Sequence, residues 1–340
     1  MKKNWHRMCT AGLSTLLLLF SLNACTNTAE QTQQTKQTED TQQIEASDTG
    51  YIAYHDAFDR EQELTAENAK RVVALYGSFA EAWELAGGTL VGVTEDAIEE
   101  RNMDLGEDVA MIGSVKEPNF EEIIALSPSL VILSADVATQ VNLEPALQQA
   151  SIPYAYFRVD TVEDYVEMMH VFSYLNGRED LYEQNAESVY DKVQEIKALV
   201  TLQPNPTGLL IRAFSTGAKA KGADNQTGVI MRDLGVDNIV ARHDSLLEDL
   251  SIEEIITEDP DYIFITTMGS EQAALTALEK GIMTNPAWAG LHAVQQDKCY
   301  VLPKDLFHYK PNARWAESYA YMAKILYPNL TEEIDNIMAT

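Results

Sequence analysis

The sequence predicts an α/β fold of two similar lobes with mainly parallel sheets. The main observation is an internal repeat, because the segment from Asn119 to Leu133 returns without a gap as Ser251 to Ile265. Each copy predicts a short helix that begins with carboxylates, which the helix dipole favours, and ends before a proline, whose preceding residue avoids the right-handed helical region. A run rich in Val, Ile and Leu follows, the pattern of a strand buried on both faces of a parallel sheet. Ligands of such sheets usually bind beyond the carboxyl ends of the strands, so two facing lobes predict a cleft.

Composition limits the classes of protein to which this chain can belong. It has 340 residues, 46% of them hydrophobic, which is enough for two domains. Lys and Arg number 24 against 53 Asp and Glu, which argues against a nucleic-acid partner and for a soluble, self-repelling surface. We expect a monomer. The three cysteines, Cys9, Cys25 and Cys299, make a disulfide framework improbable.

The N-terminus has the pattern of an export signal. Lys2, Lys3 and Arg7 precede an apolar run over residues 13–22 that is too short to span a membrane, so residues 1–24 are expected to be a signal peptide. The sequence Leu22-Asn23-Ala24-Cys25 resembles a bacterial lipobox, which implies that Cys25 carries a lipid, although Asn23 is unusual there. A plain secretory signal with an incidental cysteine is the alternative. Residues 25–48 have almost no large apolar side chains and predict a flexible tether.

Strand and helix patterns alternate along the rest of the chain, which predicts two lobes and a connector. We assign residues 49–178 to an N-terminal lobe, 179–203 to a single long connecting helix and 204–340 to a C-terminal lobe. The connector has apolar residues at three- and four-residue steps and would span roughly 30 Å. The expected strands are 71–75, 90–93, 111–113, 130–134, 152–157, 208–212, 238–240, 262–267 and 299–302, after a small hairpin over 51–64. The other expected helices are 79–86, 144–150, 164–175, 228–234 and 312–326, with a polar loop over 215–227.

Four phrases of the first lobe together resemble one family: the substrate-binding proteins of iron-siderophore, haem and cobalamin ABC importers. They are Arg71-Val72-Val73-Ala74-Leu75, Leu90-Val91-Gly92-Val93-Thr94, the first repeat copy and Ser151-Ile152-Pro153. Asn285-Pro286-Ala287-Trp288 and the segment from Phe307 to Trp315 resemble parts of the second lobe of the same family. The resemblance implies lipid anchoring outside the cytoplasm of a Gram-positive cell and a cleft that changes little on binding.

The resemblance also implies what the protein binds. The expected ligand is an iron complex, a ferric siderophore first and haem second, with a corrinoid as the alternative. The complex would be delivered to an ABC permease dimer with its cytoplasmic ATPase. In this family one acidic residue per lobe docks onto permease arginines, which points to Glu121 and Glu253; a solvated helix start is the simpler explanation of both. Glu122 and Glu254 are the neighbours most easily confused with them.

The loops at the predicted strand ends supply the candidate ligand-binding residues. In the first lobe these are Tyr76, Ser78, Phe79, Thr94, Ser134 and Arg158, and in the second Arg212, Lys219, Lys221, His243, Met268, His308, Tyr309 and Lys310. Arg is well shaped to bind carboxylates, so the cations predict an anionic chelate, against the alternative of ordinary solvated loop charge. Haem would prefer an axial ligand, for which Tyr76, Tyr309 and His308 are candidates. The scattered histidines disfavour a free metal ion.

Other classes of protein find less support. The sequence has no nucleophile elbow and no zinc-protease helix, so we expect no enzyme and no cofactor. Cys299 begins a predicted buried strand, where packing is its expected role. A hydrolase, or a surface chelate scavenger that never meets a permease, stays as the alternative from a different class.

Overall fold

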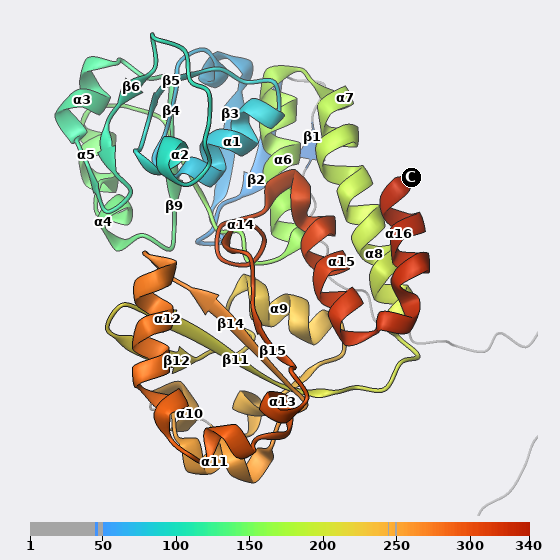
Figure 1. The fold of residues 1–340 in the computed structure, drawn as a ribbon. Helices are drawn as coiled ribbons and strands as arrows, with labels where there is room; N and C mark the ends of the chain where they lie inside the picture. The colour runs from blue at the N-terminus through green and yellow to red at the C-terminus, as the bar shows by residue number, and fades with distance from the viewer. Residues whose placement is uncertain (1–44, 47–49, 244, 249) are drawn as a thin grey trace, which may run out of the picture. The chain divides into compact units, whose positions relative to one another are not determined.

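The structure is a computed structural model that describes residues 45–46, 50–243, 245–248 and 250–340. The expected signal peptide, Cys25 and nearly all of the expected tether lie outside the described residues. The described residues belong to one compact unit, drawn in Figure 1. None of its helices combines the length and the apolar character that crossing a membrane requires.

The N-lobe is built on a five-stranded parallel sheet. Val72–Ala74 forms its central strand, and chain order reverses on either side of it, as in doubly wound folds. In sheet order the strands are β10 (Tyr154–Phe157), β9 (Leu130–Ser134), β4 (Val72–Ala74), β5 (Leu90–Val93) and β6 (Ala110–Met111). Its helices are α1 (Gly77–Leu85), α2 (Asp96–Glu99), α3 (Phe120–Ala125), α4 (Ala138–Val141), α5 (Glu144–Gln149) and α6 (Val162–Asn176). The loop before α3 holds the small ribbon β7 (Gly113–Ser114) and β8 (Glu117–Pro118).

The expected hairpin is present and gains a third strand. Strand β2 (Tyr51–His55) pairs antiparallel with β3 (Glu61–Thr65), which leads into a short 3-10 helix (Ala66–Ala69). On its other edge β2 pairs with β1 (Glu45–Ala46). Strand β1 therefore lies within the segment that composition assigned to the tether.

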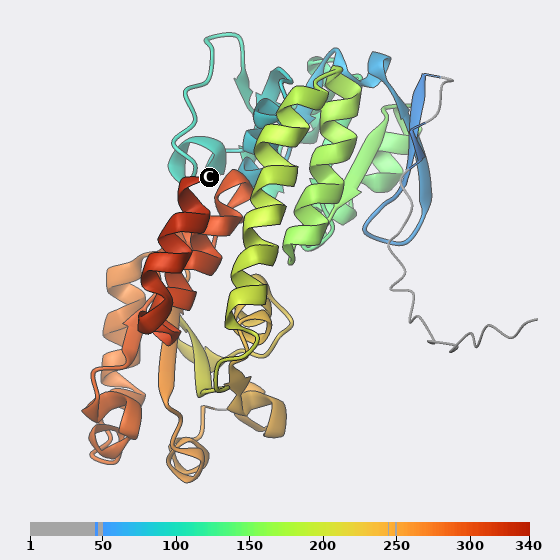
Figure 2. The same cartoon turned by 90° about the vertical axis from the view of Figure 1, so that its right-hand side faces the viewer.

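A continuous helical segment connects the lobes, as the periodicity predicts. It consists of α7 (Glu179–Tyr182), a π-helical turn (Glu183–Glu187) and α8 (Ser188–Val200). Figure 2 shows it running from one lobe to the other beside the last helices of the chain. The apolar stripe of α8 is buried, with Val193 and Ile196 fully covered. One hydrophobic cluster thus includes residues of both lobes and of the connector.

The C-lobe has a second sheet, which is parallel except for one edge strand. In sheet order its strands are β12 (Gly217–Ala220), β11 (Thr207–Phe214), β14 (Tyr262–Thr267) and β15 (Cys299–Val301), and β13 (Asp237–Asn238) pairs with the start of β11. Its helices are α9 (Gln226–Asp233), α10 (Ser245–Glu248), α11 (Ile252–Glu258), α12 (Glu271–Lys280), α13 (His292–Gln295), α14 (Lys304–Phe307), α15 (Trp315–Leu326) and α16 (Thr331–Ala339). Short 3-10 turns cover Ile239–Arg242, Ile282–Thr284, Trp288–Gly290, Asn312–Arg314 and Pro328–Leu330.

The repeat adopts the same structure in both lobes. Asn119 and Ser251 cap the two helices, and the strands that follow, β9 and β14, are buried along their whole length. In both copies the residue before the proline has a left-handed backbone: Ser127 (φ 46°) follows the C-cap Leu126, and Asp259 (φ 41°) is itself the C-cap. The prediction of helix, proline stop and doubly buried strand is therefore confirmed.

Three predictions of local structure are wrong. The expected loop 215–227 contains β12, an edge strand that turns back on β11. Its four residues are small apart from one lysine, so the sequence shows no run of large apolar residues that would predict a strand. Of the expected strand 238–240, only Asn238 lies in a strand. The chain then enters a 3-10 turn, whose start is capped by the Asn238 side chain. The final helix α16 lies beyond the expected end of the regular structure and packs on α8 and α15.

Candidate functional site

A cavity of about 830 Å³ is lined by segments of both lobes. This is within the usual range of ligand pockets, about 300–1,000 Å³. The segments that line it follow the carboxyl ends of β4, β9 and β10 in the N-lobe and of β14 and β15 in the C-lobe. The position therefore agrees with the expected cleft at the strand ends.

The N-lobe wall carries acidic and apolar groups. Tyr76 follows β4, and its neighbour Gly77 donates a backbone hydrogen bond to the buried Asp96 (2.6 Å), which fixes the start of α1. Burial raises the pKa of Tyr76, so its hydroxyl stays protonated. The other N-lobe residues of the wall are Glu100, Val115, Lys116, Asp136, Val137, Ala138, Thr139 and Asp160.

The C-lobe wall carries most of the cations. Arg212 projects from β11, Lys221 follows β12 and Lys310 follows α14. The remaining residues of this wall are Asp224, Asn225, Gln226, Met268, Gly269, Phe307 and His308. The C-lobe is thus the side of the cavity that can attract an anion.

Arg212 is the cation most ready to accept a ligand. It forms no ion pair with any carboxylate of the described residues, and its Nη2 donates only a long hydrogen bond of 3.4 Å to Asn225 Oδ1. Its buried Nε has no hydrogen-bond partner there. Burial lowers the pKa of Arg212, which shows that the guanidinium is poorly solvated. A carboxylate placed here would satisfy a buried charge without displacing another group.

The two lysines of the C-lobe wall are already paired. Lys221 Nζ lies 3.0 Å from Asp224 Oδ2, within the C-lobe. Lys310 Nζ lies 3.0 Å from Asp160 Oδ1, so this pair joins the two lobes across the cavity. An anionic ligand that binds either lysine must displace the carboxylate paired with it. No carboxylate among the described residues is paired with Arg212, so a ligand there displaces none.

His308 is kept neutral beside these cations. Burial, followed by the positive charges of Arg212, Lys304 and Lys310, lowers the pKa of His308 to about 4. Its Nδ1 is buried without a hydrogen-bond partner among the described residues. A neutral imidazole can accept a hydrogen bond or bind a metal ion through an unprotonated nitrogen.

The structure brings six of the fourteen candidate residues together in this cavity. They are Tyr76, Arg212, Lys221, Met268, His308 and Lys310. Two of the three candidate haem ligands, Tyr76 and His308, are among them. The third, Tyr309, lies outside the wall with Lys304 Nζ 5.0 Å above its ring.

Four of the N-lobe candidates are buried and support the wall from behind. Thr94 donates a hydrogen bond to Asp96 (2.6 Å) and so orders the start of α1. The Ser134 hydroxyl accepts from the backbone N–H of Asp136 (3.2 Å), a residue of the wall. The Ser78 carbonyl accepts from the Asn312 side chain of the C-lobe (2.8 Å), and Phe79 packs edge-on between Tyr76 and Phe157.

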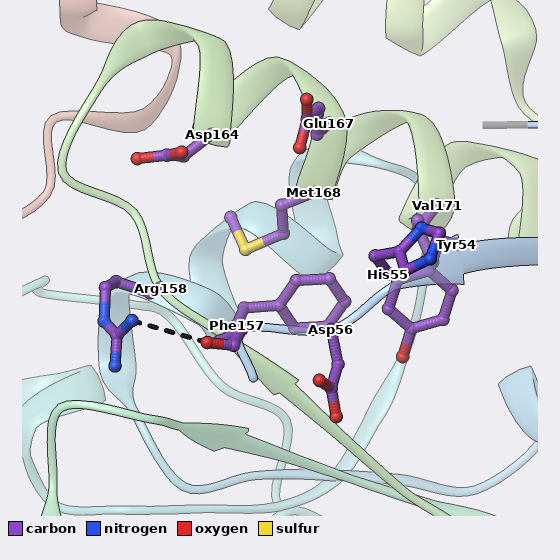
Figure 3. A pocket seen from close by; sticks show the side chains of 10 residues that line it. Tyr54, His55, Asp56, Phe157, Arg158, Asp164, Glu167, Met168 and Val171 are labelled. Carbon is purple, nitrogen blue, oxygen red and sulfur yellow. Dashed lines mark hydrogen bonds between the residues drawn. The ribbon is translucent and has the colours of Figure 1, made fainter. Parts of the chain in front are cut away.

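Arg158 lines a separate, smaller cavity of about 190 Å³ between β2 and α6 (Figure 3). Its Nε donates to Asp136 Oδ1 (2.8 Å), and its Nη1 donates to the Ala57 carbonyl (3.4 Å). Figure 3 shows Glu167 and Met168 on α6 above Phe157 and Asp56. This volume is below the range that small-molecule ligands usually need, so the larger cavity is the better candidate for a metal chelate.

The last two candidates are not among the residues that line the larger cavity. Lys219 is exposed on β12, opposite Arg212 in the strand register. His243 ends a 3-10 turn, where its Nε2 lies 2.6 Å from Glu258 Oε1. A direct role of these residues in ligand binding stays a prediction.

Sequence reasoning did not include the carboxylates of the wall. Asp160 and Asp224, which hold the two lysines, were absent from the candidates because only cations, hydroxyls and rings were sought at strand ends. The position of Asp160 shortly after β10 was a usable signal. Gln140 was also missed: its buried side chain accepts from Ser134 N and donates to the carbonyls of Leu75 and Val115, which ties three wall segments together.

Groups that could hold a metal ion are not clustered in the described residues. Within that part of the chain no three His, Cys, Asp or Glu side chains gather in a way that could hold a metal ion. Burial raises the pKa of the Cys299 thiol to about 11, so it is protonated and unreactive at neutral pH.

The two candidate docking residues lie at equivalent places outside the cavity. Glu121 and Glu253 are both exposed in the first turns of α3 and α11. No hydrogen bond or ion pair engages either side chain within the described residues. Glu254 differs, because both of its carboxylate oxygens lie 2.8 Å from the Ser245 hydroxyl. In the C-lobe, Glu253 is therefore the freer of the two adjacent carboxylates.

Comparison with known proteins gives consistent matches. A family model described as periplasmic binding protein matches residues 72–306. The Fe(3+)-citrate-binding protein YfmC of Bacillus subtilis (strain 168) is 26% identical over 73% of this chain and 78% of its own length. The petrobactin-binding protein YclQ of the same organism is 24% identical over 72% of this chain and 78% of its own. The solved TroA-like periplasmic binding protein FepB from Veillonella parvula, 16% identical, superposes with a TM-score of 0.65 over 84% of this chain and 94% of that one.

Proposed function

This chain belongs to the periplasmic binding protein family, and we propose that it captures a ferric chelate bearing carboxylate or other anionic groups. Membership in a family of binding proteins makes it an extracytoplasmic binding protein and not an enzyme. The observation that carries the proposed ligand class is Arg212, a half-buried guanidinium at the cavity wall whose buried Nε has no hydrogen-bond partner and which has no carboxylate partner among the described residues.

The remainder of the cavity supports the same ligand class. Lys221 and Lys310 line the same cavity as Arg212 and can turn from their carboxylates to a ligand, and the exposed Met268 supplies apolar surface for its organic part. The relative named for Fe(3+)-citrate binds an iron complex by name, which supports iron as the cargo.

Haem is the second candidate. Tyr76 and His308 belong to opposite lobes and line the same cavity, so each offers an axial ligand to an iron held between them. The low pKa of His308 favours this use, because only a neutral imidazole binds a metal.

The chelate would then pass to an ABC permease dimer. Glu121 and Glu253, one exposed carboxylate on each lobe, support docking of both lobes at once, because charge complementarity sets the register of an interface. Lipid attachment through Cys25 would keep the protein close to such a permease on the outer face of the membrane.

Ligand binding by the purified full-length chain tests this proposal. Thermal unfolding and tryptophan fluorescence would be measured with ferric citrate, iron-free citrate, a ferric catecholate, haem and cyanocobalamin. A ligand at one hundred times its Kd adds about 2.7 kcal/mol to the free energy of unfolding. We expect ferric citrate to stabilise the protein more than iron-free citrate does. Stabilisation by cyanocobalamin alone would refute the ferric ligand, and stabilisation by haem alone would select the second candidate.

A further inference from the structure

Each copy of the repeat exposes an isoleucine that the core does not require. Ile123 and Ile255 are fully buried beneath their helices, as core packing demands. The next residues, Ile124 and Ile256, are 43% and 41% exposed. A polar residue would be the ordinary choice at a solvent-facing helix position.

The two copies of the repeat differ at positions where neither core packing nor helix formation requires the same residue. Phe120 stands opposite Ile252, Ala125 opposite Thr257 and Leu126 opposite Glu258 in the alignment of the repeat. The residues Glu-Glu-Ile-Ile are nevertheless the same in both. The helix start accounts for the carboxylates, and the core accounts for the first isoleucine. Neither accounts for the exposed second isoleucine, which points to a requirement outside the lobe itself.

The exposed isoleucine lies beside the exposed carboxylate. Residues three apart are neighbours on one face of a helix, so Glu121 adjoins Ile124 on α3 and Glu253 adjoins Ile256 on α11. We call these two pairs the paired patches. Figure 1 shows α3 and α11 at outer parts of different lobes, so the paired patches do not merge into one surface.

We propose that Ile124 and Ile256 are apolar anchors of the paired patches and enter equivalent apolar pockets, each beside a cation, on the two halves of the permease dimer. Two separate and equivalent patches fit a partner with two equivalent surfaces. A second copy of this chain fits less well, because a two-fold dimer needs only one self-complementary patch. Apolar contact would add affinity at sites where the carboxylates mainly set the register. This inference rests on the proposed delivery to a permease.

Uptake of radioiron by cells tests the inference. Cells that naturally make the protein would have its gene deleted and replaced by full-length variants, and radioiron would be supplied in turn as ferric citrate, a ferric catecholate and haem. We expect I124S and I256S each to lower uptake about threefold and the double variant to lower it about tenfold, since each removes one apolar contact. The double variant I124L/I256L should restore uptake. Chelate binding and thermal stability of the purified variants should match those of the wild type.

The matched control is I98S/L202S, which replaces two exposed apolar residues outside the repeat, 48% and 93% exposed. Its uptake should equal that of the wild type. Equal loss in the control, or no loss in I124S/I256S, would overturn the inference while leaving the proposed function intact. A wild-type dimer in solution that I124S/I256S dissociates would overturn it in favour of self-association. No uptake by the wild type from any of the three iron sources would overturn the proposed delivery itself, and this inference with it.

Discussion

The two lobes agree in their outer helices and differ in the walls they contribute to the cavity. The N-lobe wall contains three carboxylates and one lysine: Glu100, Asp136, Asp160 and Lys116. The C-lobe wall contains three cations and one carboxylate: Arg212, Lys221, Lys310 and Asp224. Meanwhile α3 and α11 present the same carboxylate and the same isoleucine to solvent.

This contrast separates the framework from the ligand chemistry. The repeated strands and helices resemble one another because each must bury the same kind of apolar face. The loops at the strand ends are free of that demand, so they carry different charges in the two lobes. The predictions below test first where the lobes agree and then where they differ.

The largest effect is expected where the lobes agree. Reversing both Glu121 and Glu253 to Lys should abolish iron uptake, because both halves of the permease would then meet like charges. Chelate affinity should be unchanged, since neither residue lines the cavity. Radioiron uptake and a binding titration measure the two effects separately. Glu122→Lys, an exposed neighbour on α3, is the control, and unchanged uptake by the double reversal would remove the docking role.

The next effect concerns Arg212, the cation of the C-lobe wall that has no carboxylate partner among the described residues. Arg212→Gln should weaken binding of ferric citrate about 100-fold, because truncating one partner of a buried charge pair costs about 2–5 kcal/mol. Fluorescence titration measures the affinity, and thermal unfolding confirms that the variant is folded. Lys280→Gln, which replaces an exposed lysine of α12 outside the cavity lining, should change affinity little. Similar losses in both variants would indicate long-range attraction and not a site at Arg212.

Substituting the two partners of the ion pair that joins the lobes should change chelate affinity in opposite directions. Lys310→Met should weaken anionic chelate binding about tenfold by removing one charged hydrogen bond, whereas Asp160→Asn should strengthen it a few-fold by releasing Lys310. Calorimetric titration of both variants and of the double variant measures their coupling. Weaker binding in both single variants would mean that the intact pair, and not the free lysine, meets the ligand.

The smallest effect is a pH dependence of stability at His308. Its pKa falls from an ordinary value near 6.5 to about 4 in the folded protein. Above pH 6.5 both states are neutral, and as the pH falls towards 4 the unfolded state binds a proton that the folded state does not. The free energy of unfolding therefore decreases across this window, and His308→Gln should reduce the decrease by about 1–2 kcal/mol. Urea unfolding at neutral pH and at about pH 4.5 measures it. The exposed His292→Gln is the control, and equal acid sensitivity of His308→Gln and the wild type would contradict the burial argument.

Much of the fold was predictable because its strands are buried on both faces. Runs such as Leu130–Ser134 and Tyr262–Thr267 have few alternatives to a central parallel strand. The edge strand Gly217–Ala220 escaped prediction because its four residues are small apart from one lysine and its sequence resembles a loop. The site was predictable only in part, because strand ends are visible in the sequence but the direction of a side chain is not. Thr94 and Arg212 both lie near predicted strand ends, yet Thr94 is buried behind the wall and Arg212 lines it.

The sequence by itself determined the two α/β lobes, the helix between them and the family resemblance, since these follow from hydrophobic periodicity and from an internal repeat. Only the tertiary structure decided which loop residues meet. It paired Lys310 with Asp160, 150 positions away in the chain, and left Arg212 without a carboxylate among the described residues. The physical reason is that burial patterns act locally along the chain, whereas ion pairs in a cleft depend on where the two lobes bring their loops together.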